Sequence, residues 1–165
     1  MLAIRAARAG DASDLRELRL RALEDSPDAF GSSLELERGH PDSHWSELAG
    51  LSELADTIVV FVAVDGDRWL GMAAGRWYDR DRGIAGLWGM WVDPALRRLG
   101  IGERLVDAVR GWAVGHDARF LRLGAITGPG DPSSFYERLG FARTGETGTL
   151  GRDRTRSFRY LVRPV

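Results

Sequence analysis

Residues 92–103 read VDPALRRLGIGE and join an apolar, strand-like segment to an amphipathic helix. Gly100 and Gly102 remove side chains at the first turn of that helix, where backbone N–H groups have no intrahelical acceptor. A phosphate or pyrophosphate can approach such groups and is stabilised by the helix dipole. Arg97 and Arg98, just upstream, can add charge-assisted hydrogen bonds. The segment therefore predicts an anion-binding turn, and the alternative is a tight strand-to-helix turn with solvated arginines.

The segments on both sides of this turn carry clear periodicities. Apolar residues from Ile101 to Trp112 recur at helical spacing and predict a helix. Upstream, β-branched and aromatic runs at 58–64, 69–78 and 84–92 are separated by turn-forming residues. They predict three consecutive antiparallel strands. A dinucleotide-binding fingerprint is not expected, because Leu105 stands where it needs a third glycine and the adjoining units do not have a parallel βαβ pattern.

The remaining elements complete a sandwich of helices and sheet. The expected order adds a strand at 2–8, a helix after Asp11 or Ser13 that stops at Pro27, one or two short helices at 30–50 broken at His40–Pro41, a strand at 120–126, a helix at 132–139, and two strands within 141–162 around a turn at Gly145–Gly151. We expect an α/β (α+β) fold, a mixed and mostly antiparallel sheet of about seven strands flanked by about four helices.

Composition limits the class of protein. The 165 residues are 44% hydrophobic and 28% charged, as expected for one globular domain over residues 1–165 that buries roughly 70% of its unfolded surface. Arginines number 23 and acidic residues 24, so no global field favours nucleic acid or an anionic membrane. The longest apolar run, Ile58–Val64, is too short for a bilayer span, and residues 1–10 have no signal-peptide core. We therefore expect a cytoplasmic location.

Four residue types are missing from the chain: Cys, Lys, Asn and Gln. Without Cys there is no disulfide, no thiolate nucleophile and no cysteine-ligated zinc. Without Lys there is no Schiff base and no phosphate-binding loop of the Walker type. Three scattered His are too few to predict a metal cluster, so we expect no metal. The all-arginine basic set with abundant Ala, Gly and Trp is typical of a GC-rich bacterial genome.

Two motifs in order carry a family resemblance. Arg97-x-x-Gly100-x-Gly102, preceded by the strand LWGMWVDP, is followed by FYERLGF at 135–141. This pattern resembles the GNAT superfamily of N-acetyltransferases over essentially the whole chain. The stretch SPDAFGSSLELE at 26–37 is similar to the family region that shapes the acceptor site.

The resemblance implies acetyl-CoA as cosubstrate and direct acetyl transfer to an amine. It places the acetyl group and pantetheine arm against the backbone of Met90, Trp91 and Val92, with the Val92 N–H stabilising the oxyanion. The residues implied at the pyrophosphate are Arg97, Arg98, Leu99, Gly100, Ile101, Gly102 and Glu103. Tyr136 is implied as the general acid, since a phenol is protonated at neutral pH and can donate to a leaving thiolate. Its alternative role is simple packing beside Phe135.

The chain departs from the family pattern at several positions. Pro129 stands where many relatives carry an Asn, with Asp131 or Ser133 as substitutes, and the strand lacks the Glu that often serves as base, so the base is unassigned. Five polar residues could relay a proton or attract an ammonium acceptor, but we expect them to be solvated: Glu35, Glu37, Asp79, Asp81 and His44. Four aromatic residues could line an acceptor pocket, but we expect them mainly to pack in the core and at interfaces: Trp45, Trp77, Tyr78 and Trp88. We expect arginines 152, 154, 156, 159 and 163 to lie on a charged edge strand.

Three functions remain open from the sequence. The first is acetylation of a primary amine on a small molecule, with no nucleic-acid or membrane partner. The second is acetylation of a protein N-terminus, and the third is a non-catalytic acyl-CoA-binding sensor. A homodimer through the C-terminal strands is compatible with each.

Overall fold

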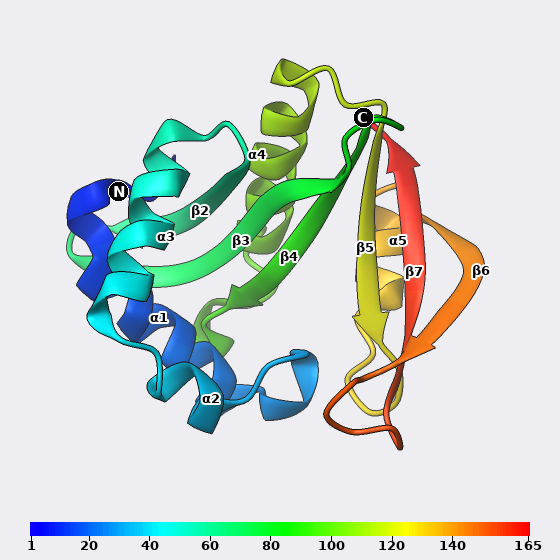
Figure 1. Cartoon of the computed structure of the whole chain (residues 1–165), viewed down its shortest axis with the longest axis horizontal. Coiled ribbons are helices and arrows are strands. Elements are labelled where there is room, and N and C mark those ends of the chain that lie inside the picture. Colours follow the sequence, from blue (N-terminus) through cyan, green and yellow to red (C-terminus); the bar gives the residue numbers. More distant parts are fainter.

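The computed structural model describes all residues from 1 to 165 and contains one seven-stranded sheet with helices on both faces (Figure 1). The strands are β1 (Leu2–Ala6), β2 (Ile58–Asp65), β3 (Arg68–Asp79), β4 (Ile84–Val92), β5 (Phe120–Ile126), β6 (Ala142–Thr149) and β7 (Ser157–Pro164). The helices are α1 (Ala12–Asp25), α2 (Leu34–Arg38), α3 (Asp42–Leu54), α4 (Ile101–Gly115) and α5 (Ser133–Arg138). The expected α+β class and strand number are confirmed, and there is one helix more than expected because His40–Pro41 separates two complete helices.

The sheet has the order β1-β2-β3-β4-β5-β7-β6, and only the β4–β5 pair is parallel. The three consecutive antiparallel strands at its centre are confirmed. The prediction that no parallel βαβ unit adjoins the glycine-rich turn is wrong, because β4, α4 and β5 form one. The parallel pairing was hidden in the sequence because it is short, joining only Ile84–Gly86 to Phe120–Arg122.

The sheet opens beyond that short parallel pairing. From Leu87 onward β4 has no partner on the β5 side, and Figure 1 shows the two strands diverging away from the C-terminus of the chain. β4 is also irregular here, since its register on β3 shifts between Trp88 and Trp91 and Gly89 has φ +60°. The result is a bulged strand end that faces an opening in the sheet.

Two apolar cores hold the helices against the sheet. Strand alternation divides β2 between them: Val59 and Ala63 face the core under α4 and α5, whereas Val60 and Val62 face the core under α1 and α3. Gly75 of β3 is needed at a close approach, because a Cβ there would lie 2.8 Å from the Trp112 ring of α4. No helix of the chain has both the length and the apolar character needed to cross a bilayer.

The C-terminal strands correct one boundary. The turn expected at Gly145–Gly151 instead spans residues 150–156, and Gly145, with φ +83°, lies within β6 where the register on β7 shifts. β6 is the edge strand and β7 is internal, so the expectation of a charged edge applies to residues 142–149 and not to the arginine-rich 157–164.

Candidate functional site

One large open cleft of about 1590 Å³ occupies the opening between β4 and β5. At one end it is lined by the start of α4 and by α5, which we call the helix end. At the other it is lined by Arg76, Tyr78 and Trp88, which we call the β3 end. The segment 25–32 after α1 also borders the cleft, as the resemblance implied for the acceptor region. The cleft therefore brings together the predicted anion-binding turn at 92–103 and the predicted acceptor region at 26–37.

The helix end contains a free helix N-terminus. The first turn of α4 begins at Gly100, which has φ +79° and open space around the position of a Cβ. Arg104 donates the first helical hydrogen bond, to the Gly100 carbonyl, so the N–H groups from Gly100 to Glu103 have no protein acceptor. These donors and the helix dipole suit an anion.

Gly102 has a different local role. A Cβ there would lie 2.9 Å from Met90 Cε and 3.2 Å from Phe135 Cζ, so its missing side chain makes room for packing. Of the residues expected at the anion, Leu99 projects into solvent and Ile101 is buried in the core, and neither side chain lines the cleft. The other eight candidate residues from Met90 to Glu103 do line it.

The backbone of Val92 is turned toward the opening. Asp93 donates to the Leu70 carbonyl of β3, and alternation along an antiparallel ladder therefore directs the Val92 N–H and C=O away from β3. Its carbonyl accepts a bond from Arg97 Nε at 3.0 Å, which agrees with that direction. The N–H on the same side faces the space between β4 and β5.

Arg97 is held by protein partners. Its Nη2 lies 2.6 Å from an Asp25 carboxylate oxygen, and the same oxygen accepts from Trp91 Nε1 at 2.9 Å and from Ser26. Burial alone would raise the pKa of Asp25, but the hydrogen bonds from Ser26, Trp91 and Arg97 outweigh it and hold that pKa below 3.8. Asp25 therefore links the C-terminal end of α1 to Trp91 of β4 and to Arg97 in the turn that follows β4. A contact from Arg97 to a bound anion stays a prediction.

Tyr136 lines the cleft from α5 while being only 5% exposed. Its ring packs between Phe135 and Phe141, with centroids 5.0 Å and 5.7 Å away. Burial raises the pKa of the phenol above its ordinary 10.0, and the hydroxyl makes no hydrogen bond within the protein. Packing and a free hydroxyl donor coexist here, so the two roles considered for this residue are compatible.

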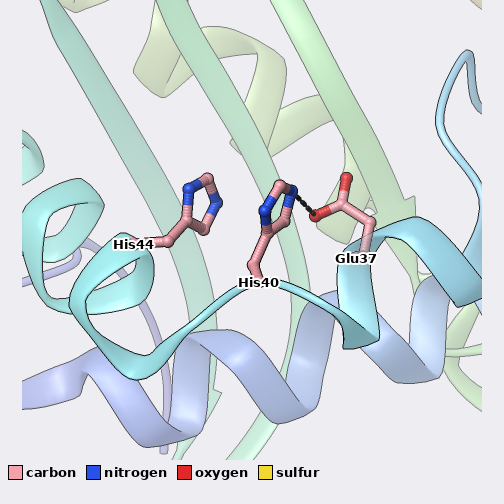
Figure 2. Close-up of side chains that lie close together, drawn as sticks. All are labelled: Glu37, His40 and His44. Atoms are coloured by element: carbon pink, nitrogen blue, oxygen red, sulfur yellow. Dashed lines mark ion pairs between the residues drawn. The ribbon is translucent and has the colours of Figure 1, made fainter.

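Glu37, His40 and His44 come together on the wall formed by α2 and α3, and we call them the histidine cluster (Figure 2). Glu37 Oε1 binds Arg19 at 3.1 Å, and its Oε2 lies 3.9 Å from His40 Nε2. Glu37 is 9% exposed, so the expectation of a solvated carboxylate is wrong: this chain folds α2 back over Arg19 and encloses it. His40 was missed, although its i+3 spacing from Glu37 is the signal for it.

The histidine cluster is not arranged as a finished metal site. Its ligand atoms all lie within 4.8 Å of one another, but the two imidazole rings are stacked 3.9 Å apart at 16°. The nitrogen lone pairs lie in those near-parallel ring planes and do not converge on one point, as a tetrahedral ion requires. The Arg19 cation on the carboxylate opposes a metal further.

Arg19 links this cluster to the β4 bulge. Its Nη1 lies 3.6 Å from the position of a Cβ on Gly89, while its Nη2 holds Glu37. Trp88, the residue before the bulge, carries the Arg76 guanidinium over its ring at 3.6 Å. Neither Arg19 nor Arg76 was anticipated, because cation placement on a sheet face depends on register, which sequence periodicity does not supply.

Other residues considered from the sequence lie partly inside and partly outside the cleft. Of the four aromatic candidates, Trp45, Tyr78 and Trp88 line the cleft, whereas Trp77 packs on Trp112. The carboxylates of Glu35, Asp79 and Asp81 do not line it, while Pro129 does. Asp131 accepts from the Ser133 N–H and hydroxyl, so both proposed substitutes are occupied with each other.

The C-terminal arginines make tertiary contacts that the sequence did not predict. Arg152 donates to the carbonyls of Phe30 and Gly31, and Arg156 binds Asp28. These bonds attach the segment 150–156 to the segment 28–31 across the cleft border.

The chain resembles known proteins in both sequence and structure. The acetyltransferase (GNAT) family model matches residues 16–141. A search of curated proteins finds no match to the sequence. The acetyltransferase of GNAT family from Streptococcus pneumoniae aligns with a TM-score of 0.81 at 18% identity, over 100% of both chains. The structure of yncA from Salmonella typhimurium with its cofactor acetyl-CoA aligns with a TM-score of 0.76 at 18% identity, over 99% of this chain and 94% of that one. An aminoglycoside 6'-N-acetyltransferase complexed with coenzyme A aligns with a TM-score of 0.71 at 16% identity, over 98% of this chain and 96% of that one.

Proposed function

Because this chain belongs to the GNAT acetyltransferase family, we propose that it transfers the acetyl group of acetyl-CoA directly to a primary amine of a small molecule. Structural neighbours that contain acetyl-CoA or coenzyme A support the choice of cosubstrate. The observation that carries the proposal is the free N-terminus of α4 in the same cleft as the bulged end of β4. A pyrophosphate on the first site brings a thioester to the second.

Each part of the cleft has a role in this reaction. The N–H groups from Gly100 to Glu103 hold the pyrophosphate, with Arg98 beside them. The Val92 N–H donates to the acetyl oxygen, where negative charge develops as the amine nitrogen attacks the carbonyl carbon. When the C–S bond breaks, Tyr136 gives its proton to the departing thiolate. The acceptor nitrogen loses one proton to solvent along the polar wall of the histidine cluster. The Tyr136 phenolate takes up one proton from solvent, so the number of protons balances.

The single-step route fits the residues that are present. The chain has no Cys, so no thiol can carry an acetyl group between donor and acceptor. Ser26 lines the cleft, but its hydroxyl donates to Asp25, a carboxylate that Trp91 and Arg97 already hold. Direct attack by the amine therefore fits the cleft best, because it needs no side chain to carry the acetyl group.

Coenzyme A release tests this proposal. Purified protein is incubated with acetyl-CoA and a panel of amines, amino acids, aminoglycosides, polyamines and short peptides, and thiol is measured with a chromogenic reagent. The absence of Cys keeps the background low. We expect amine-dependent release with at least one small molecule. Release with peptides alone would favour an acceptor at a protein N-terminus, and bound acetyl-CoA without any release would favour the sensor function.

A further inference from the structure

Arg76 is a cation without an anion. It lies on β3 at the β3 end of the cleft and makes neither a hydrogen bond nor an ion pair with the protein. Two other arginines that line the cleft have carboxylate partners: Arg19 binds Glu37, and Arg122 binds Glu146. Burial lowers the pKa of the Arg76 guanidinium, and no carboxylate opposes that effect. Arg76 is exposed in the open cleft, so its donors are accessible to an anionic ligand.

The stacking of Arg76 leaves its donors free. Its guanidinium lies over the Trp88 ring at 3.6 Å, so one face of the planar group is covered by the indole. Stacking holds the plane in a fixed orientation, while the N–H donors on its edges point away from the ring. A fixed guanidinium edge matches the two oxygens of a carboxylate in a bidentate contact.

Arg122 adds positive charge to the same corner. Tyr78 lines the cleft together with Arg76, and the Arg122 guanidinium lies 4.7 Å from the Tyr78 ring and 3.8 Å from that of Tyr160. Glu146, the partner of Arg122, is largely exposed, and the Arg122 Nε is buried without an acceptor. The corner therefore has more guanidinium donors than the protein satisfies.

Opposite charges lie close to the reactive end of β4. Trp88, under Arg76, directly precedes Gly89 of the bulge, and Arg19 beside Gly89 holds the carboxylate of Glu37. The Arg19 cation neutralises Glu37, so the charge left free near the β4 end is the Arg76 guanidinium. This charge suits an acceptor that carries an anionic group beside its amine.

We infer that the acetyl acceptor is an amino acid, whose amine is acetylated while Arg76 binds its carboxylate. This inference rests on the proposed function and narrows its acceptor from amines in general to amines that carry a carboxylate. A peptide N-terminus is excluded as the main acceptor, because its neighbouring carboxyl group is an amide and offers no charge to Arg76. A simple amine leaves Arg76 unpaired.

Matched acceptors test the inference. Coenzyme A release is measured with each common amino acid, with its carboxamide, and with the corresponding decarboxylated amine. We expect kcat/KM for the preferred acid to exceed that for its carboxamide by about ten- to a hundredfold, the range for a charged hydrogen bond. The difference is expected mainly in KM, since the carboxylate contact is the same before and during transfer.

Variants assign this preference to Arg76. Arg76→Met keeps an unbranched apolar chain over Trp88 and removes the charge, and we expect the ratio of acid to carboxamide to fall toward one. Arg76→Lys keeps a charge and is expected to recover part of the ratio. The control is Arg80→Met, since Arg80 is exposed, pairs with Asp56 and does not line the cleft. It should retain the wild-type ratio.

The outcomes separate the two proposals. Equal rates for acids, carboxamides and simple amines in the wild type would overturn this inference and leave the proposed function standing. A lower rate in Arg76→Met for acid and carboxamide alike, at an unchanged ratio, would also overturn it, because a structural role predicts that result. No release with any acceptor would overturn both proposals.

Discussion

Asp25 joins three segments of the site, and removing its carboxylate should loosen them together. One oxygen of Asp25 accepts bonds from Trp91 Nε1 at 2.9 Å and from Arg97 Nη2 at 2.6 Å. Trp91 is 5% exposed, so Asp25→Ala leaves a buried indole donor without an acceptor, which costs about 1–3 kcal/mol. The Arg97 pair is about half exposed and adds only about 0.2–1 kcal/mol. We expect a loss of about 2 kcal/mol in the free energy of unfolding.

Urea denaturation monitored by tryptophan fluorescence gives this quantity, and a melting temperature lower by about 4–8 °C should accompany it. Asp25→Asn retains an oxygen acceptor for the indole and should lose less than half as much. The matched control is Asp107→Ala, which breaks an exposed pair with Arg110 on α4 and should cost under about 0.5 kcal/mol. If Asp25→Ala were no more destabilising than Asp107→Ala, the assigned role of the carboxylate would be refuted.

Further predictions concern the acid, the packing, the pH and metals. Tyr136→Phe should lower turnover about ten- to a thousandfold with coenzyme affinity and stability nearly unchanged, because the hydroxyl has no protein partner; unchanged turnover in a coenzyme-release assay would exclude the acid role. Gly75→Ala should destabilise the fold by about 1–3 kcal/mol in urea, since the added Cβ would lie 2.8 Å from Trp112, and a neutral result would contradict the close packing. Because the pKa of Asp25 is lowered in the folded protein, its contribution to stability is fully present above the unfolded-state pKa near 3.8 and is lost as pH falls through the lower folded-state pKa. At pH values below about 4 the urea concentration at the unfolding midpoint should therefore fall, and it should fall less in Asp25→Ala. Because the lone pairs of the histidine cluster do not converge, prior treatment with EDTA should leave coenzyme release intact, and a loss reversed by zinc would show otherwise.

Local periodicity was sufficient for most of the fold. The helical spacing from Ile101 to Trp112 and the β-branched run at 58–64 each reflect burial against a sheet or helix, and both elements form where expected. The final turn was misplaced because Gly145, Gly148 and Gly151 all permit a turn. Pairing of β6 with β7 selects among them, and that pairing is a tertiary property.

The site was predictable only where its chemistry comes from the backbone. A helix N-terminus after a strand is visible in the order of residues 92–103, whichever side chains surround it. The charges of the cleft are different, because Arg19, Glu37 and Arg76 come from three separate elements. Their proximity depends on how α1, α2 and β3 pack, which no local pattern contains.

The most direct test of the account is the affinity for acetyl-CoA, measured by titration calorimetry on variants at the N-terminus of α4. Gly100→Glu puts a carboxylate where the pyrophosphate should lie, and Gly111→Glu puts the same group later in the same helix, where the surrounding space is equally open. Because Gly100 has positive φ, Arg98→Glu serves as a second variant, which reverses a charge that lines the same end of the cleft. We predict that the wild type and Gly111→Glu bind alike and that Gly100→Glu and Arg98→Glu bind at least about tenfold more weakly. Undiminished binding by both of the latter variants would contradict the central claim that this helix holds the coenzyme.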